Sequence, residues 1–173
     1  PGAKITILIA LGTHRGLTDE EIDKLCGPGI REKYSVINHA FDDPNALVQV
    51  PCSAEGVPPV FVNRLLTECD LRLAVGAVKP HPIFGWSGGA KIVIPGVAGY
   101  ETTGYSHWLT CPHMGIEVMG KEDNPVRLLY ESIVTNAHLM DFILNAVLTE
   151  DSKISDVRCG DVVKAHRAAV SIA

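Results

Sequence analysis

Two predominantly apolar segments constrain the fold of this chain more than any other feature. They are ITILIAL, residues 5–11, and LRLAVGAV, residues 71–78. Apolar runs of this length are typical of strands that are buried on both faces, as in parallel sheets. We therefore expect an α/β fold in which both segments lie in one mostly parallel sheet covered by helices.

Shorter patterns alternate strands with helices along the rest of the chain. The sequence Thr18-Asp19-Glu20-Glu21 predicts a capping box that opens a helix, which Gly27-Pro28 ends. Further strands are predicted over 34–39, 46–50, 142–149 and 154–158, and further helices over 62–69, from after Gly96 to Trp108, over 125–140 and over 162–170. Because no repeat or linker divides the chain, residues 1–173 are expected to form a single α/β domain.

The composition excludes several classes of protein. The chain has 173 residues, 46% of them hydrophobic, and a net charge of −5, which suits a soluble globular domain and argues against nucleic acid and anionic membranes as partners. No apolar run approaches the roughly 20 residues of a membrane span. Five scattered cysteines without CxxC spacing indicate reduced thiols and a cytoplasmic protein. Because a strand follows directly after Pro1-Gly2-Ala3, we expect a fragment of a longer protein.

The segment KPHPIFGWSGGAK, residues 79–91, leaves the second apolar strand. Ligands bind beyond the carboxyl ends of strands in open α/β sheets, so His81 and Lys91 are candidate site residues. Lys91 is either a solvated side chain, a partner for an anion, or a nucleophile if it is desolvated. Gly85, Gly88 and Gly89 indicate either a close approach of the backbone to a ligand or a plain turn.

Two further histidines, His14 in LGTHRG and His107 in YSHW, also follow apolar segments. Taken singly, each histidine is typical of a partly buried, hydrogen-bonded side chain. His14 and His81 follow strands whose carboxyl ends are expected at the same edge of the sheet. Together they are therefore a candidate acid/base pair near neutral pH.

Common cofactor motifs are incomplete in this chain. Ala90 precedes Lys91 and Ile92 follows it, so the glycine-rich loop is not a Walker A motif. No GxGxxG follows a strand, which disfavours an ordinary nicotinamide dehydrogenase. Cys111-Pro112-His113 offers two metal ligands without a partner pair, which is a poor zinc signal.

Several stretches resemble the N-terminal domain of the nickel-pincer lactate racemase family. They are GTHR (12–15), PH with FGWSGGAK (80–91), PGVAGYET (95–102), His107, NPVR (124–127), DFILNAVL (141–148) and GDVVKAHRAAV (160–170). The resemblance covers essentially the whole chain. It implies a Rossmann-like N-terminal domain of a two-domain racemase or epimerase that acts on a small 2-hydroxy acid.

The resemblance also implies a cofactor and a role for each candidate residue. The cofactor is the nickel-pincer nucleotide, a pyridinium mononucleotide with two sulfur-containing groups that is attached covalently at Lys91. His107 is the implied protein ligand of the nickel, and His14 and His81 are the implied groups that exchange the hydroxyl proton of the substrate. In the implied reaction the Cα hydrogen leaves as a hydride to the cofactor, which gives a transient 2-keto acid. Cofactor-maturation proteins are implied partners.

Departures from the family pattern leave an alternative open. The family usually has an arginine where Ala90 stands, which disfavours lactate itself as the substrate. The family's upstream aspartate and arginine motif and its C-terminal domain have no counterpart in this chain, so the fragment alone is expected to be inactive. The alternative is a non-catalytic module of the same fold that binds a nucleotide or a metal.

Overall fold

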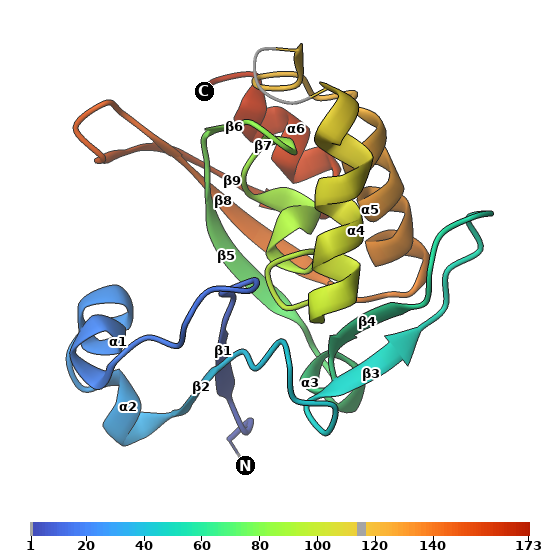
Figure 1. Cartoon of the computed structure of the whole chain (residues 1–173). Helices are drawn as coiled ribbons and strands as arrows, with labels where there is room; N and C mark the ends of the chain where they lie inside the picture. The colour runs from blue at the N-terminus through green and yellow to red at the C-terminus, as the bar shows by residue number, and fades with distance from the viewer. Residues whose placement is uncertain (1, 114–116) are drawn as a thin grey trace.

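The computed structural model describes residues 2–113 and 117–173 and has a mixed α/β architecture (Figure 1). Its strands are β1 (Thr6–Ile9), β2 (Ser35–Asn38), β3 (Leu47–Val50), β4 (Val60–Asn63), β5 (Leu73–Val78), β6 (Pro80–His81), β7 (Gly85–Trp86), β8 (Phe142–Leu148) and β9 (Ile154–Gly160). Its helices are α1 (Asp19–Cys26), α2 (Ile30–Lys33), α3 (Leu65–Glu68), α4 (Tyr100–Thr110), α5 (Pro125–Asn136) and α6 (Lys164–Val170), with short 3₁₀ helices η1 (Gly89–Ile92) and η2 (Cys111–His113).

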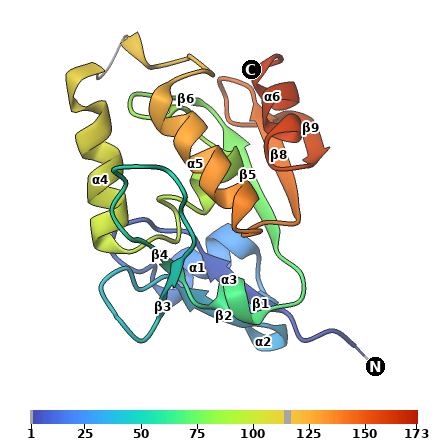
Figure 2. The same cartoon turned by 90° about the vertical axis from the view of Figure 1, so that its right-hand side faces the viewer.

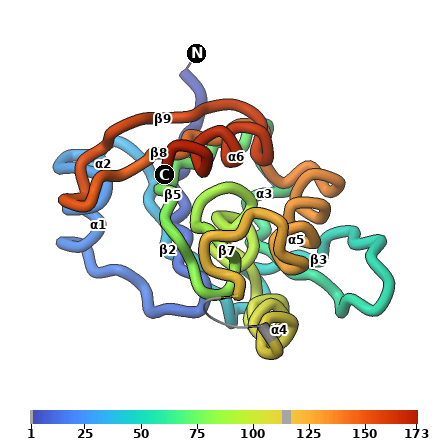
Figure 3. Tube along the Cα trace, turned by 90° about the horizontal axis from the view of Figure 1, so that it is seen from above, coloured from blue at the N-terminus to red at the C-terminus, as the bar shows by residue number. Residues whose placement is uncertain are grey.

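Parallel pairing joins β1 to β2 and β5 to β8, which confirms the predicted α/β class. The remaining pairs, β3 with β4, β6 with β7 and β8 with β9, are antiparallel. Helix α6 packs on β5, β8 and β9, whereas α5 packs on η1 and α4. Seen from above in Figure 3, α6 and β9 lie on one side of the molecule and α4 on the other, with β5 and β7 between them.

The expectation that segments 5–11 and 71–78 share one sheet is wrong for the described residues. Strand β1 pairs with β2 in a two-stranded sheet, whereas β5 belongs to the sheet of order β5-β8-β9. The physical reason is that an apolar run specifies a strand but not its partner. The two regions meet instead through a loop, because Gly12 N donates a 2.8 Å hydrogen bond to the carbonyl oxygen of Gly96.

The predicted helix over 62–69 is wrong at its start. Residues 60–63 form β4, which pairs with β3, and only Leu65–Glu68 is helical. The residues of β4, VFVN, are mainly β-branched and aromatic, and these types favour a strand when a partner strand is available. Val62 is fully buried and bridges to Ala98, so tertiary packing decides the outcome.

The capping box of α1 is confirmed. Thr18 Oγ1 accepts a hydrogen bond from Glu21 N at 3.3 Å, and Glu21 Oε2 accepts one from Thr18 N at 2.8 Å. The strands predicted over 142–149 and 154–158 and the helices predicted up to Trp108, from Pro125 and over 162–170 are present with shifted ends.

Helix η1 and the segment that follows it form the centre of the core. Ala90, Val93 and Ile94 are almost completely buried among residues of β4, α5 and the loop that ends at α4. Figure 2 shows α5 between α4 on one side and β5 and β8 on the other. Ala90, the residue before Lys91, is thus fixed by its packing in the core.

All five cysteines are free thiols. No helix within residues 2–113 and 117–173 is both long enough and apolar enough to cross a bilayer.

Candidate active site

A short hairpin and a 3₁₀ helix position His81 and Lys91. Strand β5 leads directly into β6, which ends at His81, and β6 pairs with β7 with His81 opposite Gly85. The chain then turns into η1, which contains Lys91. Both candidates therefore lie beyond the carboxyl end of β5.

Two buried polar side chains hold the loop from beneath. Asn145 Oδ1 accepts a hydrogen bond from Gly89 N at 3.1 Å, and His166 Nε2 lies 2.9 Å from the carbonyl oxygen of Ser87. Gly88 and Gly89 have φ values of 75° and 58°, and a Cβ at either position would lie 2.8 Å from Asn145 Oδ1 or His166 Cγ respectively. These glycines therefore permit close approach of the backbone to the protein's own side chains.

His81 is held in a neutral form. Its Nδ1 accepts hydrogen bonds from the backbone N–H groups of Ile83 and Phe84, at 3.2 and 3.3 Å. Burial, followed by the positive charge of Lys91, lowers the pKa of His81 to about 4. Because Nδ1 is an acceptor, the proton of the neutral ring lies on Nε2, which can donate a hydrogen bond to a ligand.

Lys91 has the environment of a reactive amine. Its side chain is half-buried, and its Nζ lies over the Phe84 ring, 5.5 Å from the centroid. Burial, followed by the positive charge of Arg127, lowers the pKa of the Lys91 amine. Both effects increase the neutral, nucleophilic fraction of the amine.

His107 lies on α4 with one ring nitrogen occupied and the other available. Its Nδ1 lies 2.8 Å from the carbonyl oxygen of Thr103 and donates a hydrogen bond to it. The lone pair is then on Nε2, which is the arrangement of a metal-ligating histidine whose other nitrogen is fixed by a carbonyl. His107 also lines a cavity of about 230 Å³ together with Thr13, Tyr100, Thr103 and Gly104.

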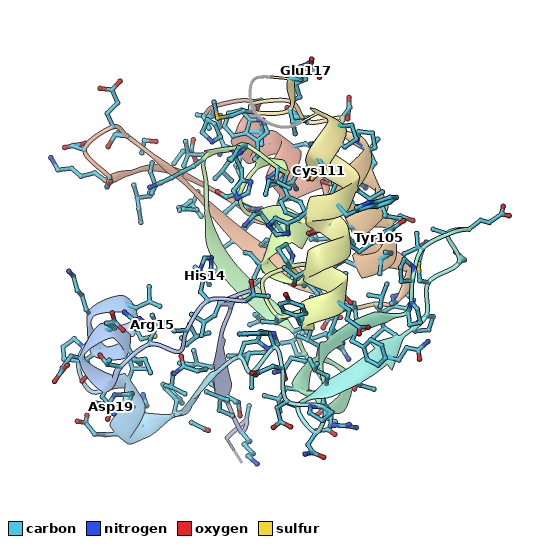
Figure 4. The ribbon with its side chains drawn as sticks, in the orientation of Figure 1. His14, Arg15, Asp19, Tyr105, Cys111 and Glu117 are labelled. Carbon is cyan, nitrogen blue, oxygen red and sulfur yellow. The ribbon has the colours of Figure 1, made fainter. Side chains whose placement is uncertain are left out.

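His14 is exposed on the loop that follows β1. Figure 4 shows it on this loop, directed away from α1, toward the part of the molecule that carries β5. The neighbouring Arg15 turns the other way and forms an ion pair with Glu21, 2.6 Å long. Thr13, next to His14, lines the cavity that also contains His107.

Three of the four predicted site residues are thus close enough to interact. Lys91 and His107 both act electrostatically on the pKa of His81. The loop of His14 approaches the segment after Lys91 through the hydrogen bond between Gly12 and Gly96. The four residues come from three separate regions of the sequence.

Sequence reasoning missed three residues that support the loop: Arg127, Asn145 and His166. All three are buried. Asn145 and His166 lie among apolar buried residues of β8 and α6, and Arg127 lies with Glu131 on the buried face of α5. Polar residues in such segments are a signal that was available in the sequence. Arg127 is the most extensively bonded of the three, with contacts to the loop on one side and to Glu131 on the other.

Ala90 points into the core rather than into the site. It is 1% exposed and packs with Val93 and Ile94.

The residues present fit a cofactor that brings most of its own metal donors. No group of three or more His, Cys, Asp or Glu side chains in the described part of the chain is arranged to hold a metal ion. One free imidazole nitrogen, on His107, and one desolvated amine, on Lys91, suit a covalently attached group that supplies the remaining ligands.

Fold and site together define an α/β protein in which a desolvated lysine and a neutral histidine follow a parallel strand. A sequence model of the lactate racemase N-terminal domain matches residues 1–117. The chain therefore belongs to the lactate racemase family, as the sequence motifs predict.

Individual relatives agree with this assignment. The chain is 31% identical to the lactate racemase of Lactiplantibacillus plantarum, over 96% of this chain and 39% of the relative, and 30% identical to that of Thermoanaerobacterium thermosaccharolyticum, over 95% and 38%. The solved lactate racemase apoprotein from T. thermosaccharolyticum superposes with a TM-score of 0.89 at 28% identity, over 98% of this chain and 40% of that one. A Thermotoga maritima protein superposes with a TM-score of 0.82 at 28% identity, over 96% and 46%. The chain thus spans about two fifths of the length of these curated relatives.

Proposed function

We propose that this chain is the part of a 2-hydroxy acid racemase or epimerase that carries the cofactor and the proton-transfer groups. The observation that supports this most directly is the Lys91 amine, desolvated and close to the neutral His81. Turnover is proposed for the full-length protein, which we infer to include a second domain, because this chain spans only 39% of the racemase it matches.

The proposed cofactor is a nickel-pincer nucleotide that is attached at Lys91 by cofactor-maturation proteins and ligated through nickel by His107. When bound, this group supplies reversible acceptance of a hydride from the substrate Cα. The chain's own contribution is to fix the cofactor. Helix α4 presents His107 Nε2, and η1, which packs in the core, presents the Lys91 amine.

His14 and His81 are the proposed proton-transfer groups. In the free chain the neutral His81 ring presents an Nε2–H that can hydrogen-bond to a substrate oxygen. To pass a proton to the alkoxide of the product, the ring must first take up a second proton at Nδ1 and so become an imidazolium. His14 is exposed and free to accept the hydroxyl proton. Because a racemase must serve both hands of the substrate, both histidines are needed in each direction.

The test uses the full-length protein, matured with cofactor-maturation proteins, and a 2-hydroxy acid that carries deuterium on Cα. We expect racemisation with the deuterium retained, and a loss of about 10²–10⁴-fold in turnover for His14→Ala and for His81→Ala. Extensive exchange of the deuterium with solvent would contradict a hydride route. Binding of the acid without turnover by the cofactor-loaded wild type would instead support a binding module.

A further inference from the structure

Arg127 lies beneath the loop that carries His81 and Lys91. The whole residue is 2% exposed. Its Nε donates a 2.9 Å hydrogen bond to the carbonyl oxygen of Phe84, and its Nη2 donates to the carbonyl oxygen of Trp86. Both acceptors lie in the turn and strand between His81 and Lys91, so one guanidinium holds the loop at two points.

The positive charge of Arg127 is shared within a buried network. Its Nη1 lies 3.3 Å from Glu131 Oε1, while Glu131 Oε2 lies 2.9 Å from Arg167. Arg167 in turn contacts Glu122 and Asp123 near the surface. The network thus contains two arginines and three carboxylates, and both arginines contact Glu131.

The groups of the site respond to this charge. After burial, the positive charge of Arg127 is the next cause that lowers the pKa of Lys91, and it also lowers the pKa of His81. It acts in the same direction on His166, which supports the same loop through Ser87. Arg127 therefore affects both the position and the protonation of the site.

We propose that Arg127 is a positioning residue for the site, which fixes the His81–Lys91 loop through two carbonyl oxygens and keeps a positive charge behind it. This inference rests on the proposed function only for its purpose: a fixed Lys91 amine with a lowered pKa favours attachment of the cofactor. A planar guanidinium can donate to two carbonyls in a fixed geometry, whereas an ammonium cannot do so from the same position.

The chain itself provides a matched control for the experiment. Arg167 belongs to the same network and bonds to the same Glu131, but its hydrogen bonds go to carboxylates and not to the loop. Arg127→Lys retains the positive charge and loses the paired hydrogen bonds of the guanidinium to Phe84 and Trp86. Arg127→Met combined with Glu131→Gln loses the charge and these hydrogen bonds. Arg167→Met is the control.

Two measurements distinguish position from charge, and neither needs the cofactor or the substrate. Hydrogen exchange of the Ser87 and Gly89 amides reports how often the loop opens. The pH midpoint for acylation of Lys91, followed by peptide mass spectrometry, reports the protonation of its amine. Lys153, whose side chain is largely exposed, is the internal reference.

We expect amide exchange to increase by about 10- to 100-fold in Arg127→Lys and in the double variant, because hydrogen bonds to a charged donor are lost. The acylation midpoint should stay near the wild-type value in Arg127→Lys, which retains the charge, and should rise in the double variant. Arg167→Met should match the wild type in amide exchange, because its hydrogen bonds do not go to the loop. Its acylation midpoint should rise less than that of the double variant, because Arg127 remains.

The proposal is overturned if Arg167→Met alters the loop as much as Arg127→Lys does, because the effect would then belong to the network as a whole. It is also overturned if Arg127→Lys exchanges like the wild type. If the double variant does not fold, Arg127→Lys against Arg167→Met decides the question alone. If exchange and the acylation midpoint change as expected while the full-length, cofactor-loaded wild type shows no racemase activity, the proposed function fails and this inference stands.

Discussion

The Nδ1 atom of His107 donates a hydrogen bond to the carbonyl oxygen of Thr103, one turn earlier on α4, at 2.8 Å. The helix itself therefore fixes the tautomer of the ring. A histidine that is held in this way has its Nε2 lone pair ready for a metal and loses little freedom on binding.

His107→Ala should lose nickel from the mature, full-length protein while it keeps the cofactor adduct, because the link to lysine does not involve the imidazole. Metal analysis together with intact mass measures both. His138→Asn is the control, since His138 is exposed and adopts a φ of 51°, which asparagine tolerates. Retention of nickel by His107→Ala would assign the metal to another ligand.

His81 should be a neutral ring with its proton on Nε2 at pH 7, because two backbone N–H groups point at Nδ1. Nitrogen-15 NMR of the chain distinguishes the two tautomers directly. The resonance should begin to titrate only as the pH approaches about 4. A protonated Nδ1 at neutral pH would contradict the described hydrogen bonds.

Stability should fall as the pH is lowered from about 7 to 5. His81 and His166 have pKa values lowered to about 4, from an ordinary 6.5, chiefly by burial, and burial also lowers the pKa of His39. The unfolded chain therefore binds more protons than the folded one between these values, so the contribution is complete above pH 6.5 and is lost on acidification.

For the fully buried His166 the loss by pH 5 is about 1–2 kcal/mol. Urea unfolding at both pH values measures it, and His166→Gln should reduce the difference, whereas His138→Asn should not. Equal stability of the wild type at pH 7 and pH 5 would contradict this assignment.

Ala90→Arg should lower the free energy of unfolding by about 2–4 kcal/mol, because the position is buried in the core and has no room for a charged side chain. Ala168→Arg, at an exposed position of α6, should change it little. Urea denaturation compares the two variants. If Ala90→Arg is as stable as the wild type, the arginine must turn out of the core and toward Lys91.

Local patterns predicted much of the secondary structure. The capping box at Thr18 and the strand over 71–78 are local features, and both are present. Sheet partners depend on long-range pairing, so the separation of β1 from β5 could not be seen in the apolar runs. The hairpin of β6 and β7 was missed because two-residue strands carry almost no pattern.

The residues of the candidate site also fall into two groups: those that local patterns predicted and those that only the fold shows. His81 and Lys91 could be found because they follow a recognisable strand, and His14 for the same reason. Arg127 and Asn145 lie 36 and 54 residues after Lys91 in the sequence, so only the folded chain shows that they support its loop. Their polar character inside apolar segments was the one local sign.

The central claim is that Lys91 carries the cofactor, and peptide mapping of the mature, full-length protein tests it most directly. The protein and a lactate racemase relative should be produced in the same cells with cofactor-maturation proteins, together with Lys91→Ala and with Lys121→Ala as the control. We predict added mass on the peptide that contains Lys91, its loss in Lys91→Ala and its retention in Lys121→Ala. Added mass on another residue, or an unmodified Lys91 in cells where the relative is modified, would contradict the account.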